Sequence, residues 1–104
     1  GSSGSSGMAE AAAPWYHGPL SRTDAENSLL RMPEGTFLVR DSTSSPGDYV
    51  LSCSENGKVT HYKLSAEEGK IRIDTHLFDN LDAAITFYME HELEYSSLKQ
   101  PLQR

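Results

Sequence analysis

Arg40 is the residue of this chain whose type and position most directly point to chemistry. It follows Phe37-Leu38-Val39, in a run typical of a buried strand, and an arginine keeps its proton there. An unpaired buried charge costs several kcal/mol, so the guanidinium needs an anion. The nearest acid, Asp41, is the next residue in the strand and therefore points to the opposite face.

The turn that follows Ser42 offers hydroxyl groups and no acid. Period-two alternation places Leu38 and Ser42 on the same face as Arg40, and the turn Thr43-Ser44-Ser45-Pro46-Gly47 follows. An arginine beside such a loop favours an anion supplied from outside the chain, and phosphate matches the guanidinium fork. The alternative is a structural ion pair between Arg40 and a carboxylate elsewhere in the chain.

Composition limits the classes of protein to which such a site can belong. The chain has 104 residues and a net charge of −6, which fits one domain and argues against a nucleic-acid partner. One cysteine, Cys53, excludes an internal disulfide and fits a reducing compartment. No apolar run reaches the roughly 18 residues of a membrane span. We therefore expect a cytoplasmic monomer with no cofactor, no metal and no membrane span.

The start of the chain differs in composition from the rest. GSSGSSG, residues 1–7, is typical of an expression-tag remnant, and residues 8–13 are expected to form a flexible lead-in. We expect one domain over residues 14–102. If Met8 is the native start, the domain would lie at the N-terminus of its protein.

Hydrophobic periodicity and turn residues predict the elements that position Arg40. Ser21 and Asp24 resemble a capping box at a helix start, and Asn56-Gly57 is typical of a tight hairpin turn. The fold class is α+β, with a central antiparallel sheet flanked by two helices. The expected elements are a helix from Ser21 to about Leu30, strands at Thr36–Asp41, Asp48–Ser54, Val59–Leu64 and Ile71–Ile73, and a helix after Asn80.

Spacing within these elements brings more cations toward Arg40. His61 and Lys63 share one face of their strand. Arg22 lies three residues before Ala25 and seven before Leu29, so it is expected on the inward face of the first helix, at its start. The N-terminus of a helix favours anions. Each also has a structural alternative: an exposed helix charge for Arg22, a bond within the sheet for His61, and solvation for Lys63. If the helix packs on the side of Arg40, a deep phosphate pocket would contain Arg22, Arg40, Ser42, Thr43, Ser44, His61 and Lys63.

Several motifs stand in the order found in Src homology 2 domains, and the chain resembles that family from about residue 14 to residue 102. They are Trp15-Tyr16-His17-Gly18, Leu20-Ser21-Arg22 with Ala25-Glu26, Gly35-Thr36-Phe37-Leu38-Val39-Arg40-Asp41-Ser42, Gly47-Asp48-Tyr49-Val50-Leu51-Ser52, Val59-Thr60-His61-Tyr62-Lys63 and Phe78-Asp79-Asn80-Leu81. The resemblance implies a non-catalytic signalling module that binds phosphotyrosine peptides in extended form. Within the family, the run Pro46-Gly47-Asp48-Tyr49-Val50-Leu51-Ser52 with Ser54-Glu55-Asn56 is most similar to Crk-type adaptors, and next to Csk-type kinases.

The resemblance also implies a role for each residue of the phosphate pocket. Arg40 would hold two phosphate oxygens, and Arg22 would contact both phosphate and ring. The hydroxyls of Ser42, Thr43 and Ser44 would donate to phosphate. His61 would support the pocket, and Lys63 would flank the tyrosyl ring.

By the same resemblance, peptide residues after the phosphotyrosine are read on the other face of the third strand. Tyr62 would form a floor there with Leu64, although both could simply belong to the core. Ile73, Leu93 and Tyr95, in two loops, would give apolar walls to a pocket for the third residue after phosphotyrosine. Asp74, Glu92 and Glu94 would repel acidic ligand residues nearby.

Two other classes fit the residues less well. An enzyme acting on phosphotyrosine needs a nucleophile, and the only thiol, Cys53, lies in a predicted strand. Val59 stands where the tyrosine-phosphatase loop has its arginine, and no kinase loop or metal cluster is present. A scaffold that has lost phosphate binding is disfavoured by Arg40 together with Arg22. The sequence therefore predicts a module without catalytic residues, which an adaptor, a kinase or a phosphatase could contain.

Overall fold

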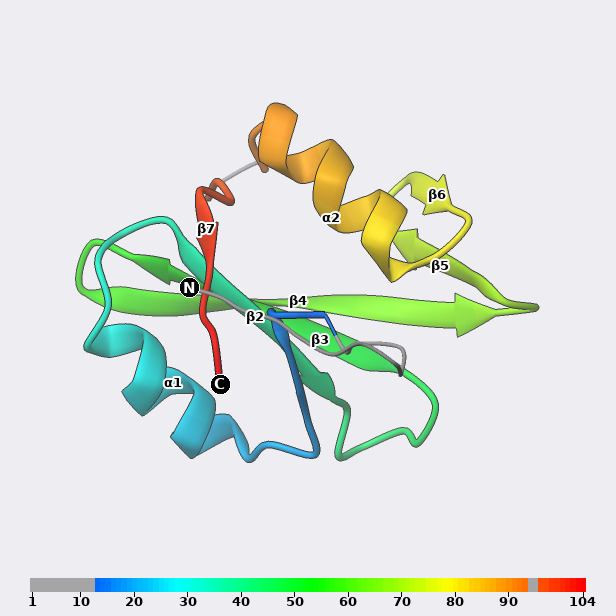
Figure 1. The fold of residues 1–104 in the computed structure, drawn as a ribbon. Coiled ribbons are helices and arrows are strands. Elements are labelled where there is room, and N and C mark those ends of the chain that lie inside the picture. The colour runs from blue at the N-terminus through cyan, green and yellow to red at the C-terminus, as the bar shows by residue number, and fades with distance from the viewer. Residues whose placement is uncertain (1–12, 94–95) are drawn as a thin grey trace, which may run out of the picture.

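The computed structural model of the chain describes residues 13–93 and 96–104. Its helices lie on opposite sides of a twisted sheet (Figure 1). The expected tag remnant and most of the lead-in fall outside the described residues. The elements are β1 (Tyr16–Gly18), α1 (Arg22–Leu30), β2 (Thr36–Asp41), β3 (Tyr49–Glu55), β4 (Lys58–Glu67), β5 (Lys70–Ile73), β6 (His76–Phe78), α2 (Leu81–Glu90) and β7 (Gln100–Pro101).

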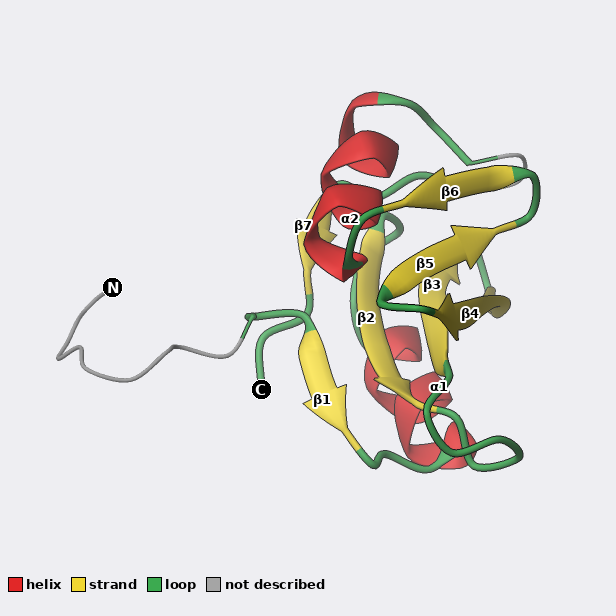
Figure 2. Cartoon of the chain, turned by 90° about the vertical axis from the view of Figure 1, so that its right-hand side faces the viewer, coloured by secondary structure: helices red, strands yellow, loops and turns green. Residues whose placement is uncertain are grey.

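The α+β class is confirmed, and the sheet is mixed. β2, β3 and β4 are antiparallel neighbours, as predicted, and β5 and β6 continue the sheet beyond β4. β1 and β7 both pair in parallel with β2, along its other edge (Figure 2). The sequence does not predict β1, β6 and β7, because strands of two or three residues are too short to show alternation.

The turn between β3 and β4 fixes which residues face one another in the sheet. Gly57 has a φ of 96°, a left-handed conformation that glycine adopts without strain. The resulting register pairs Ser52 with His61. Two residues after His61, Lys63 pairs with Val50 of β3, and Val50 pairs in turn with Arg40 of β2. Lys63 and Arg40 therefore lie in line across the three strands. A local turn thus sets part of the distant site.

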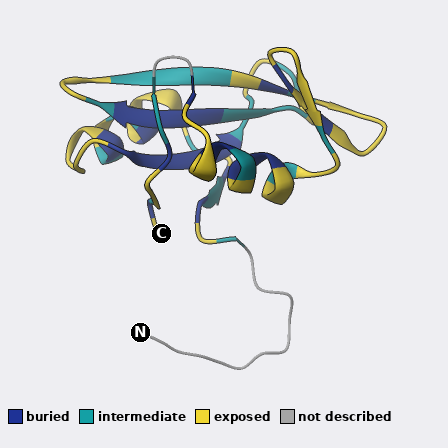
Figure 3. Cartoon of the chain, turned by 90° about the horizontal axis from the view of Figure 1, so that it is seen from above, coloured by how far each residue is buried: buried dark blue, intermediate teal, exposed yellow. Residues whose placement is uncertain are grey.

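Each face of the sheet carries a hydrophobic cluster. On one face, α1 buries Ala25 and Leu29 against Leu38, all fully buried. On the opposite face, Ile85 of α2 belongs to a larger cluster with Phe37 of β2. Fully burying a side chain of this size stabilises the fold by about 1.5–3 kcal/mol. The central strands are accordingly buried along most of their length, whereas the outer turns of the helices are exposed (Figure 3).

The two helices begin differently. The side-chain oxygen of Asn80, the residue after which the second helix is expected, accepts a hydrogen bond from the Ala83 N–H at 2.7 Å and caps α2. Ser21 occupies the N-cap position of α1, but its side chain makes no capping hydrogen bond. The predicted capping box is therefore wrong, and Ser21 contributes its backbone oxygen, which accepts the first helical bond from the Ala25 N–H.

We expect the variant Asn80→Ala to lower the free energy of unfolding by about 0.5–2 kcal/mol, because it removes the capping bond of α2. Ser21→Ala is the matched control, and it should change that free energy by less than about 0.5 kcal/mol. Urea denaturation followed by circular dichroism measures both values. Equal losses in the two variants would contradict the difference between the caps.

Candidate ligand-binding site

Arg40 lies on the α1 face of β2 and is 5% exposed. Its Nη1 donates to the backbone oxygen of Leu20 at 3.3 Å, and its buried Nε has no hydrogen-bond partner among the described residues. Among the described residues, no carboxylate forms an ion pair with Arg40. Burial, and then the charge of Arg22, lower the pKa of Arg40, but a guanidinium stays charged at neutral pH. Within the described part of the chain, this buried cation therefore has no carboxylate in ion-pair contact.

Arg40 lines a cavity of about 290 Å³ together with three other residues predicted for the site. Arg22 comes from the start of α1, and His61 and Lys63 come from the α1 face of β4. Tyr62 also lines this cavity, and it packs against the core cluster of the other face as well. The four basic residues therefore line one cavity, as their spacing predicts, and this cavity is called the basic cavity below.

The predicted hydroxyl groups lie beside this cavity and not in its wall. Ser42 and Thr43 line a neighbouring cavity of about 530 Å³, and Ser44 is exposed. The Oγ of Ser42 accepts a hydrogen bond from the Ser45 N–H at 3.2 Å, and its own N–H donates to the Asp48 oxygen at 3.1 Å. The loop after β2 is thus closed on itself, next to the basic cavity.

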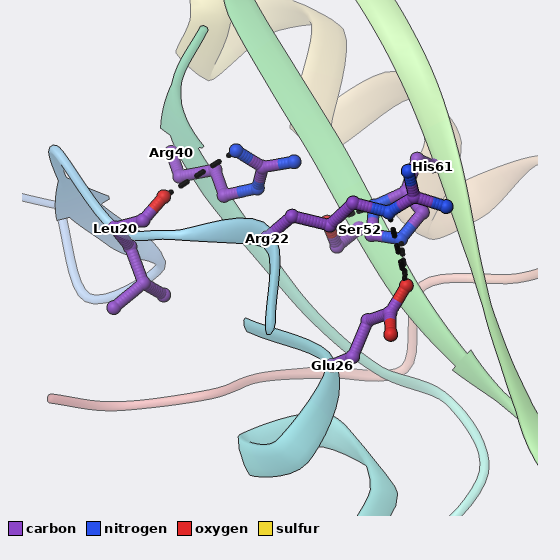
Figure 4. A network of polar contacts seen from close by, with 6 residues as sticks. All are labelled: Leu20, Arg22, Glu26, Arg40, Ser52 and His61. Carbon is purple, nitrogen blue, oxygen red and sulfur yellow. Dashed lines mark hydrogen bonds and ion pairs between the residues drawn. The ribbon is translucent and has the colours of Figure 1, made fainter. Parts of the chain in front are cut away.

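Glu26, which is not among the residues predicted for the site, also reaches it (Figure 4). Its Oε2 accepts hydrogen bonds from Arg22 Nε at 3.2 Å and from His61 Nε2 at 2.9 Å. On the other side of the ring, His61 Nδ1 lies 2.9 Å from the Oγ of buried Ser52. The bonds from His61 and then from Arg22 lower the pKa of Glu26, so it is ionised at neutral pH.

The bonds of Glu26 determine where His61 carries its proton. A carboxylate only accepts, so Nε2 carries a proton and donates to Glu26, while Nδ1 shares the second hydrogen bond with the Ser52 hydroxyl. Both missed residues carry a signal in the sequence. Glu26 follows Arg22 by four positions, a helical contact spacing, and the turn at Gly57 places Ser52 opposite His61.

A larger cavity, of about 590 Å³, lies on the other side of β4. His61, Tyr62 and Lys63 line both this cavity and the basic one, so β4 forms a ridge between them. Ile73 and Leu93 are in its wall, as predicted. The wall also contains Asp74, His76, Phe87, Tyr88, His91 and Glu92.

The aromatic part of this wall is not predicted from the sequence. The ring of Phe87 stacks on His91 with 4.5 Å between ring centroids, and it meets His76 at 5.3 Å. Burial, and then the charge of Asp74, raise the pKa of Tyr88, which stays neutral. The end of α2 therefore supplies flat apolar surface to the cavity, with Asp74 and Glu92 exposed beside it.

Two residues predicted for peptide recognition are not part of this wall. Leu64 is fully buried in the core, so no peptide can touch it. Alternation correctly places it on the face of Tyr62, but the core covers that face at the position of Leu64. Tyr95, like Glu94, lies outside the described residues.

Together these elements define a class of binding domain: a sheet between two helices, with a basic cavity and an aromatic cavity separated by one strand. The family model described as SH2 domain matches residues 15–88. The chain therefore belongs to the SH2 (Src homology 2) family, whose members are non-catalytic phosphotyrosine-binding signalling modules. The resemblance found in the sequence is confirmed.

Individual relatives agree with this assignment. The chain is 43% identical over 95 residues to human SHC-transforming protein 4 and 45% identical over 92 residues to the adapter molecule Crk of Drosophila melanogaster. These alignments cover 86% and 84% of the chain but only 15% and 34% of the relatives. The solution structure of the VAV1 SH2 domain complexed with a tyrosine-phosphorylated peptide from SLP76 matches with a TM-score of 0.82 and 32% identity. That match covers 100% of this chain and 90% of the VAV1 chain.

Proposed function

We propose that this domain binds phosphotyrosine peptides in extended form and that its basic cavity receives the phosphate. One observation carries the proposal: Arg40 is 5% exposed, has no anionic partner among the described residues, and lines a cavity with Arg22, His61 and Lys63. A phosphate dianion supplies the missing charge, and its oxygens match the guanidinium fork. The phosphopeptide bound by the similar VAV1 domain supports the same class of ligand.

The position of each residue suggests its part in holding the phosphotyrosine. Arg40, at the bottom of the cavity, would bind two phosphate oxygens, and the exposed Arg22 would close on phosphate and ring. Lys63 would flank the ring, and His61, fixed on both sides, would shape the wall. Ser42, Thr43 and Ser44 would donate to phosphate if their loop closes over the ligand.

The test of this function is a calorimetric titration of the domain with one peptide in its phosphorylated and unphosphorylated forms. We expect binding that requires the phosphate. We propose that the natural partners are tyrosine-phosphorylated proteins of the cytoplasm and that the domain binds them as a monomer, without a nucleic-acid partner. Among the described residues, no helix has the length and apolarity needed to cross a membrane.

The aromatic cavity suggests how the peptide is selected beyond the phosphotyrosine. An extended chain advances about 3.3 Å per residue, so three residues span about 10 Å. That length carries the peptide from the basic cavity across Tyr62 and into the cavity walled by Ile73 and Leu93. We propose that this cavity takes an apolar residue, leucine or proline, at the third position after the phosphotyrosine.

Acidic residues at that third position are expected to be disfavoured. Asp74 and Glu92 border the cavity, so a peptide with glutamate there should bind at least about fivefold more weakly than one with leucine or proline. A phosphopeptide array measures the three affinities. Asp74→Asn should reduce the difference, because it removes one of the two repelling charges. Equal binding of the glutamate and leucine peptides to the original domain would refute the apolar pocket.

A further inference from the structure

Glu26 forms ion-pair contacts with two of the four basic residues in the wall of the basic cavity. Its Oε2 is 3.2 Å from Arg22 Nε and 2.9 Å from His61 Nε2 (Figure 4). The same two bonds lower its pKa, so the carboxylate is charged. The domain therefore carries an anion of its own beside the place proposed for the phosphate.

The two bonds of Glu26 differ in how easily a ligand can break them. The side chain of His61 is 20% exposed and lies between Glu26 and Ser52, so water reaches this bond poorly. The side chain of Arg22 is 73% exposed and meets Glu26 on the helix surface, four residues away. Contacts of this exposed kind are weak and are screened by salt. An incoming anion can therefore take Arg22 from Glu26 while His61 stays in place.

We propose that Glu26 is an internal competitor of the phosphate: it holds Arg22 in the free domain and thereby lowers the affinity for phosphotyrosine. The inference rests on the proposed function, and it gives a part in phosphotyrosine binding to Glu26, which does not line the basic cavity. Phosphotyrosine wins the competition because it carries a charge of about −1.5 to −2 and several acceptor oxygens, against one carboxylate charge. Arg22 exchanges its partner when the ligand binds, and Glu26 is left with His61.

The variant Glu26→Gln tests the competition, because glutamine keeps the length and an acceptor for His61 but has no charge. We expect it to bind phenyl phosphate and a phosphotyrosine peptide about threefold to fivefold more tightly at low ionic strength. The gain should shrink at about 0.5 M salt, where exposed charges are screened. Asp24→Asn is the matched control: it removes the same charge from α1 at a position without an ion pair among the described residues, and it should change affinity less than about twofold.

A double-mutant cycle with Arg22→Gln separates capture of Arg22 from general repulsion of the ligand. In the Arg22→Gln background, Glu26→Gln should change the affinity by less than about twofold. An equal gain in both backgrounds would overturn the proposal, as would unchanged or weaker binding by a folded Glu26→Gln variant. If the original domain bound no phosphotyrosine peptide at all, the proposed function would fail first, and the competition with it.

Discussion

The variant Arg40→Lys is expected to weaken binding of a phosphotyrosine peptide by at least about tenfold, which corresponds to about 1.4 kcal/mol. A hydrogen bond to a charged group contributes about 1.5–3 kcal/mol, and the guanidinium can make two parallel ones to phosphate. A lysine ammonium at the same position is a point charge and cannot copy that geometry. Titration calorimetry measures the loss.

The fold should survive this substitution, because the anion that Arg40 needs comes from the ligand. Among the described residues its guanidinium bonds only the Leu20 oxygen, at 3.3 Å. Urea denaturation checks that the variant remains folded. Arg31→Lys, an exposed position at the other end of α1, is the matched control and should leave the affinity unchanged. A folded Arg40→Lys domain that binds like the original would refute the assignment of Arg40 as the phosphate clamp.

The strand side of the basic cavity could be predicted from the sequence because strand alternation and one turn determine it, whereas the place of Arg22 depends on how α1 packs. Alternation places Arg40 on the face opposite Asp41, and it places His61 and Lys63 together. The turn at Gly57 then sets the register that lines up Lys63 with Arg40. These are local rules, and the structure follows them.

Contacts between distant elements are what the sequence leaves open. Glu26 meets His61 across 35 positions of sequence, and no local pattern says that α1 brings its carboxylate to that ring. The aromatic cavity likewise depends on where the end of α2 lies beside β5, which brings Phe87 near Ile73. Leu64 shows the same limit, because alternation gives the face of a residue and not how deeply that face is covered.

Phosphoserine and phosphothreonine versions of a good peptide are expected to bind at least about a hundredfold more weakly than the phosphotyrosine version. The reason is the burial of Arg40. Its side chain is almost completely buried, and Arg22, Lys63 and Tyr62 line the same cavity. A tyrosine carries its phosphate one phenyl ring farther from the backbone than a serine does, so only the tyrosine can reach Arg40 while its peptide stays on the surface.

The size of this expected loss follows from the bonds that a short side chain cannot make. Losing two charge-assisted hydrogen bonds to Arg40, at the lower value of about 1.5 kcal/mol each, corresponds to about a hundredfold in affinity. Titrations of three peptides that differ only in the phosphorylated residue measure it, and the unphosphorylated tyrosine peptide serves as the control. In the Arg40→Lys domain, the difference in affinity between the phosphotyrosine and phosphoserine peptides should become smaller. The reason is that the buried guanidinium, which only the longer side chain can reach, is no longer present. Comparable binding of the phosphoserine and phosphotyrosine peptides by the original domain would instead identify the cavity as a shallow, general anion site.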